Sequence, residues 1–324
     1  MQMKVLVTSG SFQDVPGKHR ELLYQQDFSV DAIHGPFTEA MFLDVIAGYD
    51  ALLCGDDDVT AIVLQKGRQG KLKYISKYGV GVDKIDLAKA KELGIPVTIC
   101  PGVNQHAVAE LVFALLLSFA RNIYIDYEIT KNGGWTKHIG EEMYGKTMGI
   151  IGFGAIGKEV AKRAKAFGMH VLITTGHPDA GYIAGNGYTL VSGLAELAAK
   201  CDIISLHVPH TPKTNEIINA ELISNHLKRG TIIINTARGK LVNAAAVKKG
   251  LDDGVIAAYL TDVLDIEPTP PGYILLDAPN VLITPHIGSR TYQSAERQGV
   301  LAVKNLINML SGNVEAYMPN MAYK

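Results

Sequence analysis

Residues 148–167, with the sequence MGIIGFGAIGKEVAKRAKAF, indicate the fold of the second half of the chain. Residues 148–151 have the character of a strand, three glycines follow in the Gly-X-Gly-X-X-Gly spacing, and apolar residues then recur at helical intervals. Strand, loop and helix in this order are typical of a dinucleotide-binding unit, whose loop admits a pyrophosphate to the amide N–H groups of the helix N-terminus. The expected contacts to such a ligand are Gly152, Gly154, Ala155, Ile156 and Gly157.

Short β-branched segments alternate with helical segments on both sides of this stretch. Ahead of it, the expected strands span residues 4–8, 27–33, 50–53, 73–76 and 96–99. After residue 147, the expected strands span residues 148–151, 170–173, 202–206, 231–235, 255–260 and 281–284. This spacing predicts a small α/β unit with a parallel sheet, a boundary near residue 102, and then a six-strand doubly wound pattern. A last periodic segment, at about residues 291–310, can return to pack on the first unit.

Composition and charge exclude several classes of protein. The 324 residues are 47% hydrophobic, which is enough for a buried core, and 31 Lys and Arg nearly balance 32 Asp and Glu, which gives no basic field for nucleic acid. The longest apolar segment, residues 107–120, falls short of the ~20 residues that a bilayer span needs, so a buried helix is expected there. The N-terminus lacks the pattern of a signal peptide. We therefore expect a cytoplasmic protein without a nucleic-acid or membrane partner.

The three cysteines have no Cys-X-X-Cys spacing, so the sequence indicates neither a disulfide framework nor a zinc site. Cys54, Cys100 and Cys201 are expected to be small buried hydrophobic residues.

A second glycine motif competes for a phosphate-binding role. Gly140, four further residues, and then Gly145, Lys146 and Thr147 match the Gly-X4-Gly-Lys-Thr pattern of a nucleoside-triphosphate-binding loop. Such a loop follows a strand and opens a helix, whereas this match leads directly into the expected strand at 148–151 and holds two acidic residues. An NTPase would lose Mg-dependent ATP hydrolysis on substitution of Lys146, and we expect no such activity.

The choice between NAD and NADP depends on the end of the strand that follows the glycine loop. An NAD site usually carries Asp or Glu there, about 20 residues past the loop, to bind the ribose diol. Thr175 stands at that position and removes the repulsion against a 2′-phosphate, although no Arg is nearby and His177 is only a weak candidate to bind one. The sequence therefore indicates NAD or NADP, with a slight preference for NADP.

Three segments that follow later strands carry polar side chains, at the ends where an open α/β sheet places its ligands. They are residues 235–239 with Arg238, residues 262–268 with Glu267, and residues 284–288 with His286. Reduction of a 2-keto acid requires a guanidinium that holds a carboxylate, an imidazole that passes a proton, and a carboxylate that orients the imidazole. Each residue alone also fits an ordinary surface or loop position, and spacing alone does not select them.

An ordered series of motifs along the chain does select them. The series comprises Tyr78-Gly79-Val80-Gly81-Val82-Asp83, Pro101-Gly102-Val103-Asn104, Ala107-Val108-Ala109-Glu110-Leu111, Gly134-Trp135, Tyr144-Gly145-Lys146-Thr147, Leu206-His207-Val208-Pro209, Asn235-Thr236-Ala237-Arg238-Gly239, residues 262–268 and Pro285-His286-Ile287-Gly288. With these motifs the chain resembles, over almost its whole length, the D-isomer-specific 2-hydroxyacid dehydrogenases, and especially the branch that contains D-3-phosphoglycerate dehydrogenase. The resemblance also explains the triphosphate-loop match as the family's lead-in to the first strand of its cofactor domain.

The resemblance implies an α/β fold of two Rossmann-like domains. A doubly wound parallel-sheet cofactor domain, residues 103–289, would be inserted into a smaller flavodoxin-like substrate domain, residues 1–102 and 290–324, with the active site in the cleft between them. The implied reaction is hydride transfer between the nicotinamide of NAD or NADP and a D-2-hydroxy acid or 2-keto acid, and the implied assembly is a homodimer joined through the cofactor domains.

The resemblance also implies roles for residues at matching positions. His286 would be the acid/base with Glu267 as its partner, and Arg238 would anchor the substrate carboxylate. The further implied contacts are Gly79, Val80 and Gly81 as backbone donors to the substrate carboxylate, Asp262 at the nicotinamide carboxamide, and Val208, Pro209, Thr236 and Gly288 along the cofactor.

The substrate itself stays open. Phosphoglycerate dehydrogenases of this family tend to carry an Arg in the loop after the strand at 50–53, where it would meet the substrate phosphate. Here the loop reads Gly55-Asp56-Asp57-Asp58, and three acids beside a phosphate would repel it unless a cation from elsewhere supplies the contact. An alternative of the same ancestry is a dinucleotide-sensing, corepressor-like binding protein without turnover, which tight NAD(P)H binding without keto-acid reduction would favour.

Overall fold

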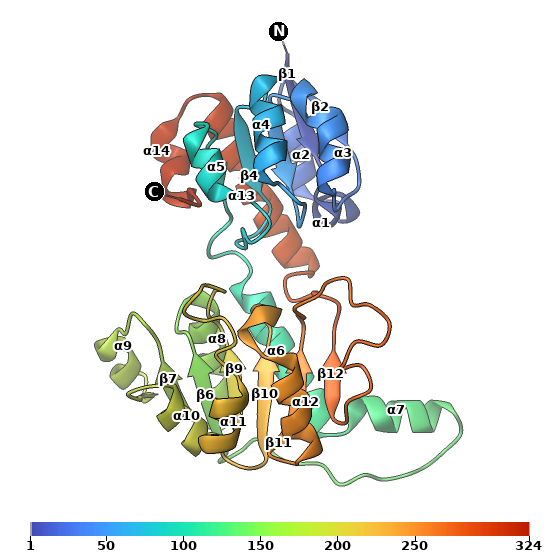
Figure 1. Cartoon of the computed structure of the whole chain (residues 1–324), viewed down its shortest axis with the longest axis vertical. Helices are drawn as coiled ribbons and strands as arrows, with labels where there is room; N and C mark the ends of the chain where they lie inside the picture. Colours follow the sequence, from blue (N-terminus) through green and yellow to red (C-terminus); the bar gives the residue numbers. More distant parts are fainter. Residues whose placement is uncertain (1, 324) are drawn as a thin grey trace. The chain divides into compact units, whose positions relative to one another are not determined.

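The computed structural model describes residues 2–323, and its contacts divide the chain into two compact units. The first unit combines the residues up to Asn104 with those from Ser289 onward, and the second unit is Gln105–Gly288 (Figure 1). The chain therefore crosses from the first unit to the second and back again, and each unit has its own sheet and hydrophobic core.

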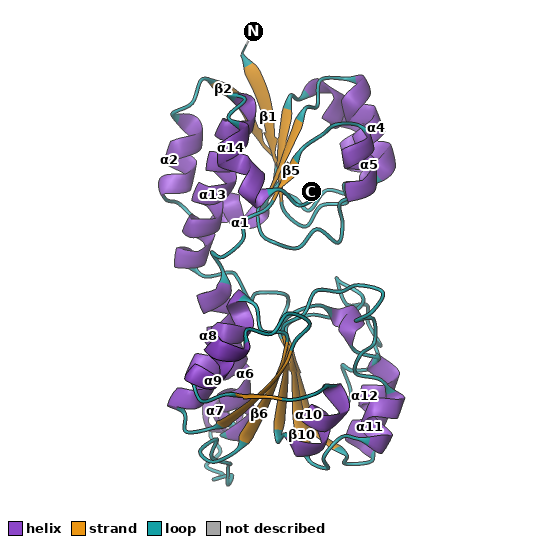
Figure 2. Ribbon diagram, turned by 90° about the vertical axis from the view of Figure 1, so that its left-hand side faces the viewer, coloured by secondary structure: helices purple, strands orange, loops and turns teal. Residues whose placement is uncertain are grey.

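The first unit is built on a five-stranded parallel sheet with the strand order β2-β1-β3-β4-β5. Its strands are β1 Met3–Val7, β2 Phe28–Ala32, β3 Ala51–Cys54, β4 Tyr74–Lys77 and β5 Val97–Thr98. Its helices are α1 Gly10–Asp14, α2 Lys18–Tyr24, α3 Glu39–Val45, α4 Ala61–Gln69, α5 Leu87–Glu92, α13 Tyr292–Leu310 and α14 Val314–Tyr317, with the 3-10 turns η1 Ile46–Gly48 and η3 Met318–Asn320. Helices cover both faces of the sheet, with α2 and α13 on one side and α4 and α5 on the other (Figure 2).

Successive side chains of a strand point to opposite faces of the sheet, so the central strands contribute apolar side chains to the core on both faces. Val5 and Val7 of β1 point to the face that α13 covers, where Val303 and Leu306 meet them. Leu6, between the two valines, belongs to the core cluster on the opposite face. The segment at the end of the chain is thus part of the core of the first unit.

The second unit holds a seven-stranded parallel sheet with the strand order β12-β11-β10-β9-β6-β7-β8. Its strands are β6 Thr147–Ile151, β7 His170–Thr174, β8 Thr189–Leu190, β9 Ile203–Leu206, β10 Thr231–Asn235, β11 Ile256–Thr261 and β12 Val281–Ile283. Its helices are α6 Gln105–Ala120, α7 Ile123–Lys131, α8 Ala155–Ala166, α9 Ala180–Gly185, α10 Leu194–Lys200, α11 Ala220–Asn225 and α12 Ala244–Asp252, with the 3-10 turn η2 Gly239–Leu241.

The two sheets confirm the predicted α/β class with two Rossmann-like folds, but the expectation of six strands in the second sheet was wrong by one. The seventh strand, β8, has only two residues, both exposed, and it pairs with β7 at the edge of the sheet. A strand this short buries no apolar side chain, so it leaves no periodic signal in the sequence.

Helix α6 is buried in the second unit, as its apolar composition predicts. Val112 and Leu116 are fully inaccessible, and Phe113 stacks on Phe167 with 5.2 Å between ring centroids. Among residues 2–323, no single helix is long and apolar enough to cross a membrane, whereas α6 and α7 together pass that test by length and composition as a pair bent by 61°.

The three cysteines are free and buried, as expected from their spacing. Burial raises the pKa of the Cys54 and Cys201 thiols to about 12 and that of Cys100 to about 11. All three are therefore protonated near neutral pH and act as packing residues.

The strand order of the second sheet contains one switch point. From β6 the chain moves outward to β7 and β8, and it then returns to the other side of β6 to form β9, β10, β11 and β12. Ligands of open α/β sheets bind beyond the carboxyl ends of the strands at such a point. The switch point therefore places the expected ligand site at the loops after β6 and β9.

Candidate active site

The glycine loop after β6 has the close contacts that the Gly-X-Gly-X-X-Gly spacing predicts. Gly152 has a φ of 95°, and its N–H donates to the carbonyl of Thr174 at 2.9 Å. A Cβ at Gly152 would lie 2.4 Å from the carbonyl oxygen of His207, and one at Gly157 would lie 2.2 Å from the carbonyl oxygen of Gly152. Glycine is thus required at both positions, because the loop packs directly on β9 and on its own helix.

The second glycine of the loop, Gly154, faces open space. A Cβ at Gly154 would meet no atom within 4 Å, and Gly154 is the N-cap of α8, where no side chain caps the helix. Ala155 is exposed, Ile156 is half-buried, and the first turn holds no acidic residue. The amide N–H groups of this helix terminus and the open surface above Gly154 fit the pyrophosphate of a dinucleotide.

Residues after the neighbouring strands surround this loop. Val208 follows β9, and its Cγ1 would lie 2.7 Å from a Cβ on Gly152, while Pro209 beside it is exposed. Thr175 follows β7 and is half-buried. The hydroxyl of Thr236, after β10, is buried without a hydrogen-bond partner. Because an unpaired buried hydroxyl is costly, Thr236 fits a position that is completed by a polar group of a bound ligand.

His207 is neutral in this setting. Burial lowers the pKa of its imidazole to about 3, and its Nε2 lies 2.8 Å from the hydroxyl of Ser205. It therefore carries no positive charge at this loop, to which the N-terminus of α8 contributes a positive potential.

The triphosphate-loop match does not form such a loop. Thr147 begins β6, so the motif leads into a strand and not into a helix. Lys146 binds Glu141 through its Nζ at 2.7 Å. The NTPase interpretation therefore lacks the structure that it requires.

A buried asparagine at the end of β10 fixes the loop that carries Arg238. The amide nitrogen of Asn235 donates to the carbonyl of Arg238 at 2.9 Å, and its oxygen accepts from the N–H of Ala237 at 3.1 Å. A Cβ at Gly239 would lie 2.0 Å from the carbonyl carbon of Leu264, so the next residue packs directly against the loop after β11. The Arg238 side chain is half-buried, and its Nη1 donates to the carbonyl of Ala237 at 2.6 Å.

His286 and Glu267 form a hydrogen-bonded pair. The Nδ1 of His286 lies 2.8 Å from Oε2 of Glu267, and Oε1 of Glu267 accepts from the N–H of Leu264 at 2.8 Å. Because a carboxylate only accepts, the hydrogen lies on Nδ1, and Nε2 is the ring atom directed away from Glu267. The two side chains are 42% and 36% exposed, so a ligand can reach the imidazole.

Asp262 fixes the backbone of the segment that carries His286. Its carboxylate accepts hydrogen bonds from the hydroxyl of Thr284 at 2.6 Å and from the N–H groups of Ile287 at 2.8 Å and Gly288 at 2.7 Å. Its carbonyl accepts from the N–H of His286 at 2.9 Å, which holds that residue at a φ of 54°. Burial nevertheless raises the pKa of Asp262, since the carboxylate is 1% exposed. The residue expected at the nicotinamide carboxamide is thus also the clamp for the acid/base segment.

The three side chains expected to perform chemistry share one edge of the second sheet. Arg238 follows β10, Glu267 follows β11 and His286 follows β12, and these strands are parallel neighbours. Parallel strands place their carboxyl ends at the same edge, where the glycine loop after β6 also lies (Figure 1). The guanidinium of Arg238, the carboxylate of Glu267, the imidazole of His286 and the N-terminus of α8 thus all lie at the carboxyl ends of this sheet.

The segment Gly79-Val80-Gly81 belongs to the first unit and follows β4. Gly79 has a φ of 118°, and its carbonyl accepts from the N–H of Cys100 at 2.7 Å. Val80 is exposed and Gly81 is half-buried. The turn thus presents backbone to solvent at the carboxyl edge of the five-stranded sheet.

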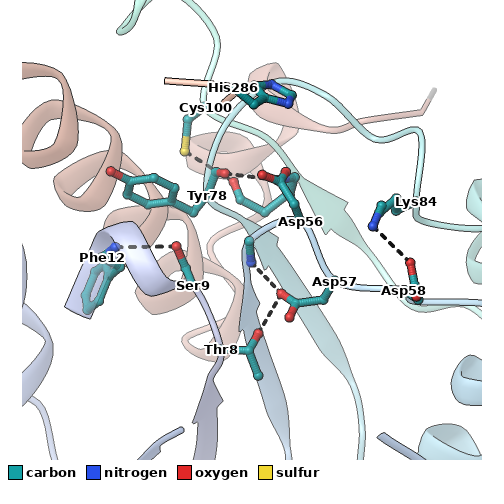
Figure 3. A network of polar contacts seen from close by, with 12 residues as sticks. Thr8, Ser9, Phe12, Asp56, Asp57, Asp58, Tyr78, Lys84, Cys100 and His286 are labelled. Carbon is teal, nitrogen blue, oxygen red and sulfur yellow. Dashed lines mark hydrogen bonds and ion pairs between the residues drawn. The ribbon is translucent and has the colours of Figure 1, made fainter. Parts of the chain in front are cut away.

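The three acids after β3 do not act alike, which corrects the expectation that all of them face a phosphate. Asp57 is 1% exposed, and its carboxylate accepts from the hydroxyl of Thr8 at 2.7 Å and from the N–H of Gly55 at 2.7 Å (Figure 3). It serves as an internal brace of the loop. Asp58 is half-buried, and its carboxylate binds Lys84 at 3.2 Å (Figure 3).

Sequence reasoning missed Lys77, the last residue of β4. Its side chain is 7% exposed, and its Nζ lies 3.0 Å from the carboxylate of Asp56 and 3.1 Å from the carbonyl of Tyr78. The feature of the sequence that could have pointed to this residue is a lysine at the end of a strand, shortly before the glycine turn at 79–81.

Comparison with known proteins agrees with this geometry. Residues 113–288 match the family model described as D-isomer specific 2-hydroxyacid dehydrogenase, NAD binding domain. The chain belongs to the D-isomer specific 2-hydroxyacid dehydrogenase family, and its second unit contains an NAD-binding domain of that family.

The relatives include enzymes with different names. The chain is 39% identical to D-3-phosphoglycerate dehydrogenase of Methanocaldococcus jannaschii over 88% of its own length and 54% of that protein, so it spans about half of this relative. It is 38% identical to hydroxypyruvate reductase of Thermotoga maritima over 89% of its length and 93% of that protein. Among solved structures, D-lactate dehydrogenase of Aquifex aeolicus complexed with NAD and lactic acid gives a TM-score of 0.85 at 30% identity, over 98% of each chain.

An Asp262→Asn substitution tests the clamp on the acid/base segment. A carboxamide has one acceptor oxygen where the carboxylate has two, so at least one donor of the 284–288 segment would lose its partner. We expect the free energy of unfolding to fall by about 1–3 kcal/mol and amide hydrogen exchange at Ile287 and Gly288 to accelerate. The exposed Asp277→Asn is the matched control. Unchanged exchange at both amides in Asp262→Asn would show that the carboxylate does not hold the segment.

Proposed function

We propose that this chain is an NAD(P)-dependent D-2-hydroxyacid dehydrogenase that also reduces 2-keto acids. The observation that carries the proposal is the His286–Glu267 pair at 2.8 Å, on the same sheet edge as Arg238 and the glycine loop. The fit of Gly154 and Thr236 to a bound dinucleotide supports it.

In this proposal each side chain has one task in the reduction of a 2-keto acid. The guanidinium of Arg238 binds the substrate carboxylate and polarises the adjacent carbonyl, and the amides of Gly79, Val80 and Gly81 donate further hydrogen bonds to the carboxylate. The Nε2 of His286 donates a proton to the carbonyl oxygen as the alcohol forms. Glu267 stabilises the imidazolium and keeps the hydrogen on Nδ1. The bound nicotinamide supplies the hydride.

The corepressor-like alternative gains no support from the comparisons. The relatives described above are named a dehydrogenase, a reductase and a dehydrogenase. These relatives are named for different substrates. Their names therefore favour the proposed class of reaction but do not select one keto acid.

Substitution of His286 and Arg238 tests the assigned tasks. We expect His286→Gln to lower kcat by about 10²- to 10⁴-fold while the Kd for NADH is unchanged, because only proton transfer is removed. We expect Arg238→Ala to act mainly on the KM of the keto acid. NADH absorbance in steady state and NADH fluorescence measure the two effects, with the exposed His226→Gln as control. A fully active His286→Gln enzyme would show that the acid/base is another residue.

The chain is further proposed to accept NADP, with a slight preference over NAD. Thr175 stands directly after Thr174, whose carbonyl binds the glycine loop, and it carries no charge that would repel a 2′-phosphate.

A Thr175→Asp substitution tests this preference. An acid at this position would repel the 2′-phosphate and bind the ribose diol, so kcat/KM for NADPH should fall by roughly tenfold or more while that for NADH is kept or raised. Thr175→Ser is the control, because it retains a neutral hydroxyl. A wild-type enzyme that is inactive with NADPH would contradict the proposal.

We also propose a homodimer joined through the second unit. Helix α7 buries none of its residues, and its Ile123 and Tyr127 are exposed, as are Trp135 and Ile139 in the segment that follows. Exposed apolar surface of this kind is typical of a subunit contact. Helix α6, in contrast, packs mainly within its own unit.

Light scattering at micromolar concentration is expected to give twice the mass of one chain. Ile139→Asp should shift the protein toward the monomer, because Ile139 is 98% exposed in the isolated chain and a charge there would be buried in the contact. Ile62→Asp, on the exposed face of α4, is the control. A monomeric wild-type protein would rule out the dimer.

A further inference from the structure

A buried ammonium group lies against the glycine turn of the first unit. Lys77 ends β4, and its Nζ would lie 3.7 Å from a Cβ on Gly79, the first residue of the turn to which the proposed function assigns the substrate carboxylate. The side chain is 7% exposed, so water screens its charge only weakly.

Asp56 is the carboxylate that balances this charge. Its Oδ1 lies 3.0 Å from Nζ of Lys77, and its side chain is 73% exposed. Strands β3 and β4 are parallel neighbours with Cys54 opposite Lys77, so Asp56, two residues after β3, stands at the same sheet edge as the glycine turn. The carboxylate therefore covers the ammonium on its solvent side.

The neighbouring acids have other partners and do not share this position. Asp57 points into the unit, where it accepts from Thr8 and Gly55, and Asp58 binds Lys84 (Figure 3). The Lys77 ammonium and the Asp56 carboxylate thus form an ion pair beside the turn.

The Asp56–Lys77 pair would act on the substituent on carbon 3 of a 2-keto acid bound at this turn. A phosphate dianion would approach the exposed carboxylate of Asp56 and would have to displace it from Lys77. An uncharged hydroxymethyl group meets no such repulsion, and its hydroxyl can donate to the carboxylate. We propose that the Asp56–Lys77 pair determines specificity by selecting 2-keto acids with an uncharged, hydroxyl-bearing substituent against phosphorylated ones. This inference rests on the proposed function.

Removal of the Asp56 charge should unmask the ammonium for a phosphate. In Asp56→Asn, we expect the ratio of kcat/KM for phosphohydroxypyruvate to that for hydroxypyruvate to rise by roughly tenfold or more relative to the wild type, the scale of one charge interaction at intermediate dielectric. Asp58→Asn removes the same charge from the same loop and should leave the ratio unchanged. NADH and NADPH oxidation with the two keto acids measures it.

A double substitution shows whether Lys77 carries the gain. If the ammonium binds the phosphate, the rise in the ratio should disappear in Asp56→Asn/Lys77→Met. Circular dichroism and thermal unfolding check that the double variant folds. If it does not fold, the single variant Asp56→Asn still tests the inference, because Asp56 is exposed. A wild type that prefers phosphohydroxypyruvate, or an equal ratio in Asp56→Asn and Asp58→Asn, would overturn the inference. A wild type that oxidises NADH or NADPH with neither of these keto acids, nor with glyoxylate or pyruvate, would instead overturn the proposed function.

Discussion

Two buried polar side chains at the carboxyl ends of the seven-stranded sheet hold the loops of the candidate site in place through the hydrogen bonds that they donate or accept. Asn235 and Asp262 are 0% and 1% exposed, and each directs its hydrogen bonds to the loop that follows its own or the adjacent strand. A buried polar group that loses its partners is costly, so these bonds leave the loops one stable arrangement. The hydrogen bonds of Asn235 and Asp262 therefore fix the backbone that carries Arg238 and His286 relative to strands β10, β11 and β12.

The first unit uses the same device for a different loop. Asp57 is as inaccessible as Asp262, and it braces the turn after β3 through Thr8 and Gly55. In both units a buried carboxylate accepts hydrogen bonds from backbone N–H and hydroxyl groups of a loop at the carboxyl ends of the strands. An acidic residue beside a candidate site can thus stabilise the loops of that site. Its hydrogen bonds distinguish such a residue from one that faces solvent, such as Asp56.

Much of the fold could be predicted because parallel strands and helices leave strong periodic signals. The glycine loop was predictable to the residue, since Gly152 and Gly157 have no room for a side chain. Strand β8 was missed because its two exposed residues bury nothing. Contacts between neighbouring segments determine which of the three acids after β3 is buried and which one pairs with Lys77. Local sequence carries no information on such contacts.

The proposed function requires that residues at the carboxyl ends of the seven-stranded sheet reduce a 2-keto acid to the D-2-hydroxy acid. The configuration of the product formed from hydroxypyruvate and a reduced nicotinamide cofactor reports on this reaction, because a single configuration requires binding, hydride transfer and proton transfer in one defined geometry. Chiral chromatography of the glycerate formed should give the D isomer alone. Formation of the L isomer or of a racemic mixture would contradict the arrangement of Arg238 and His286 described here.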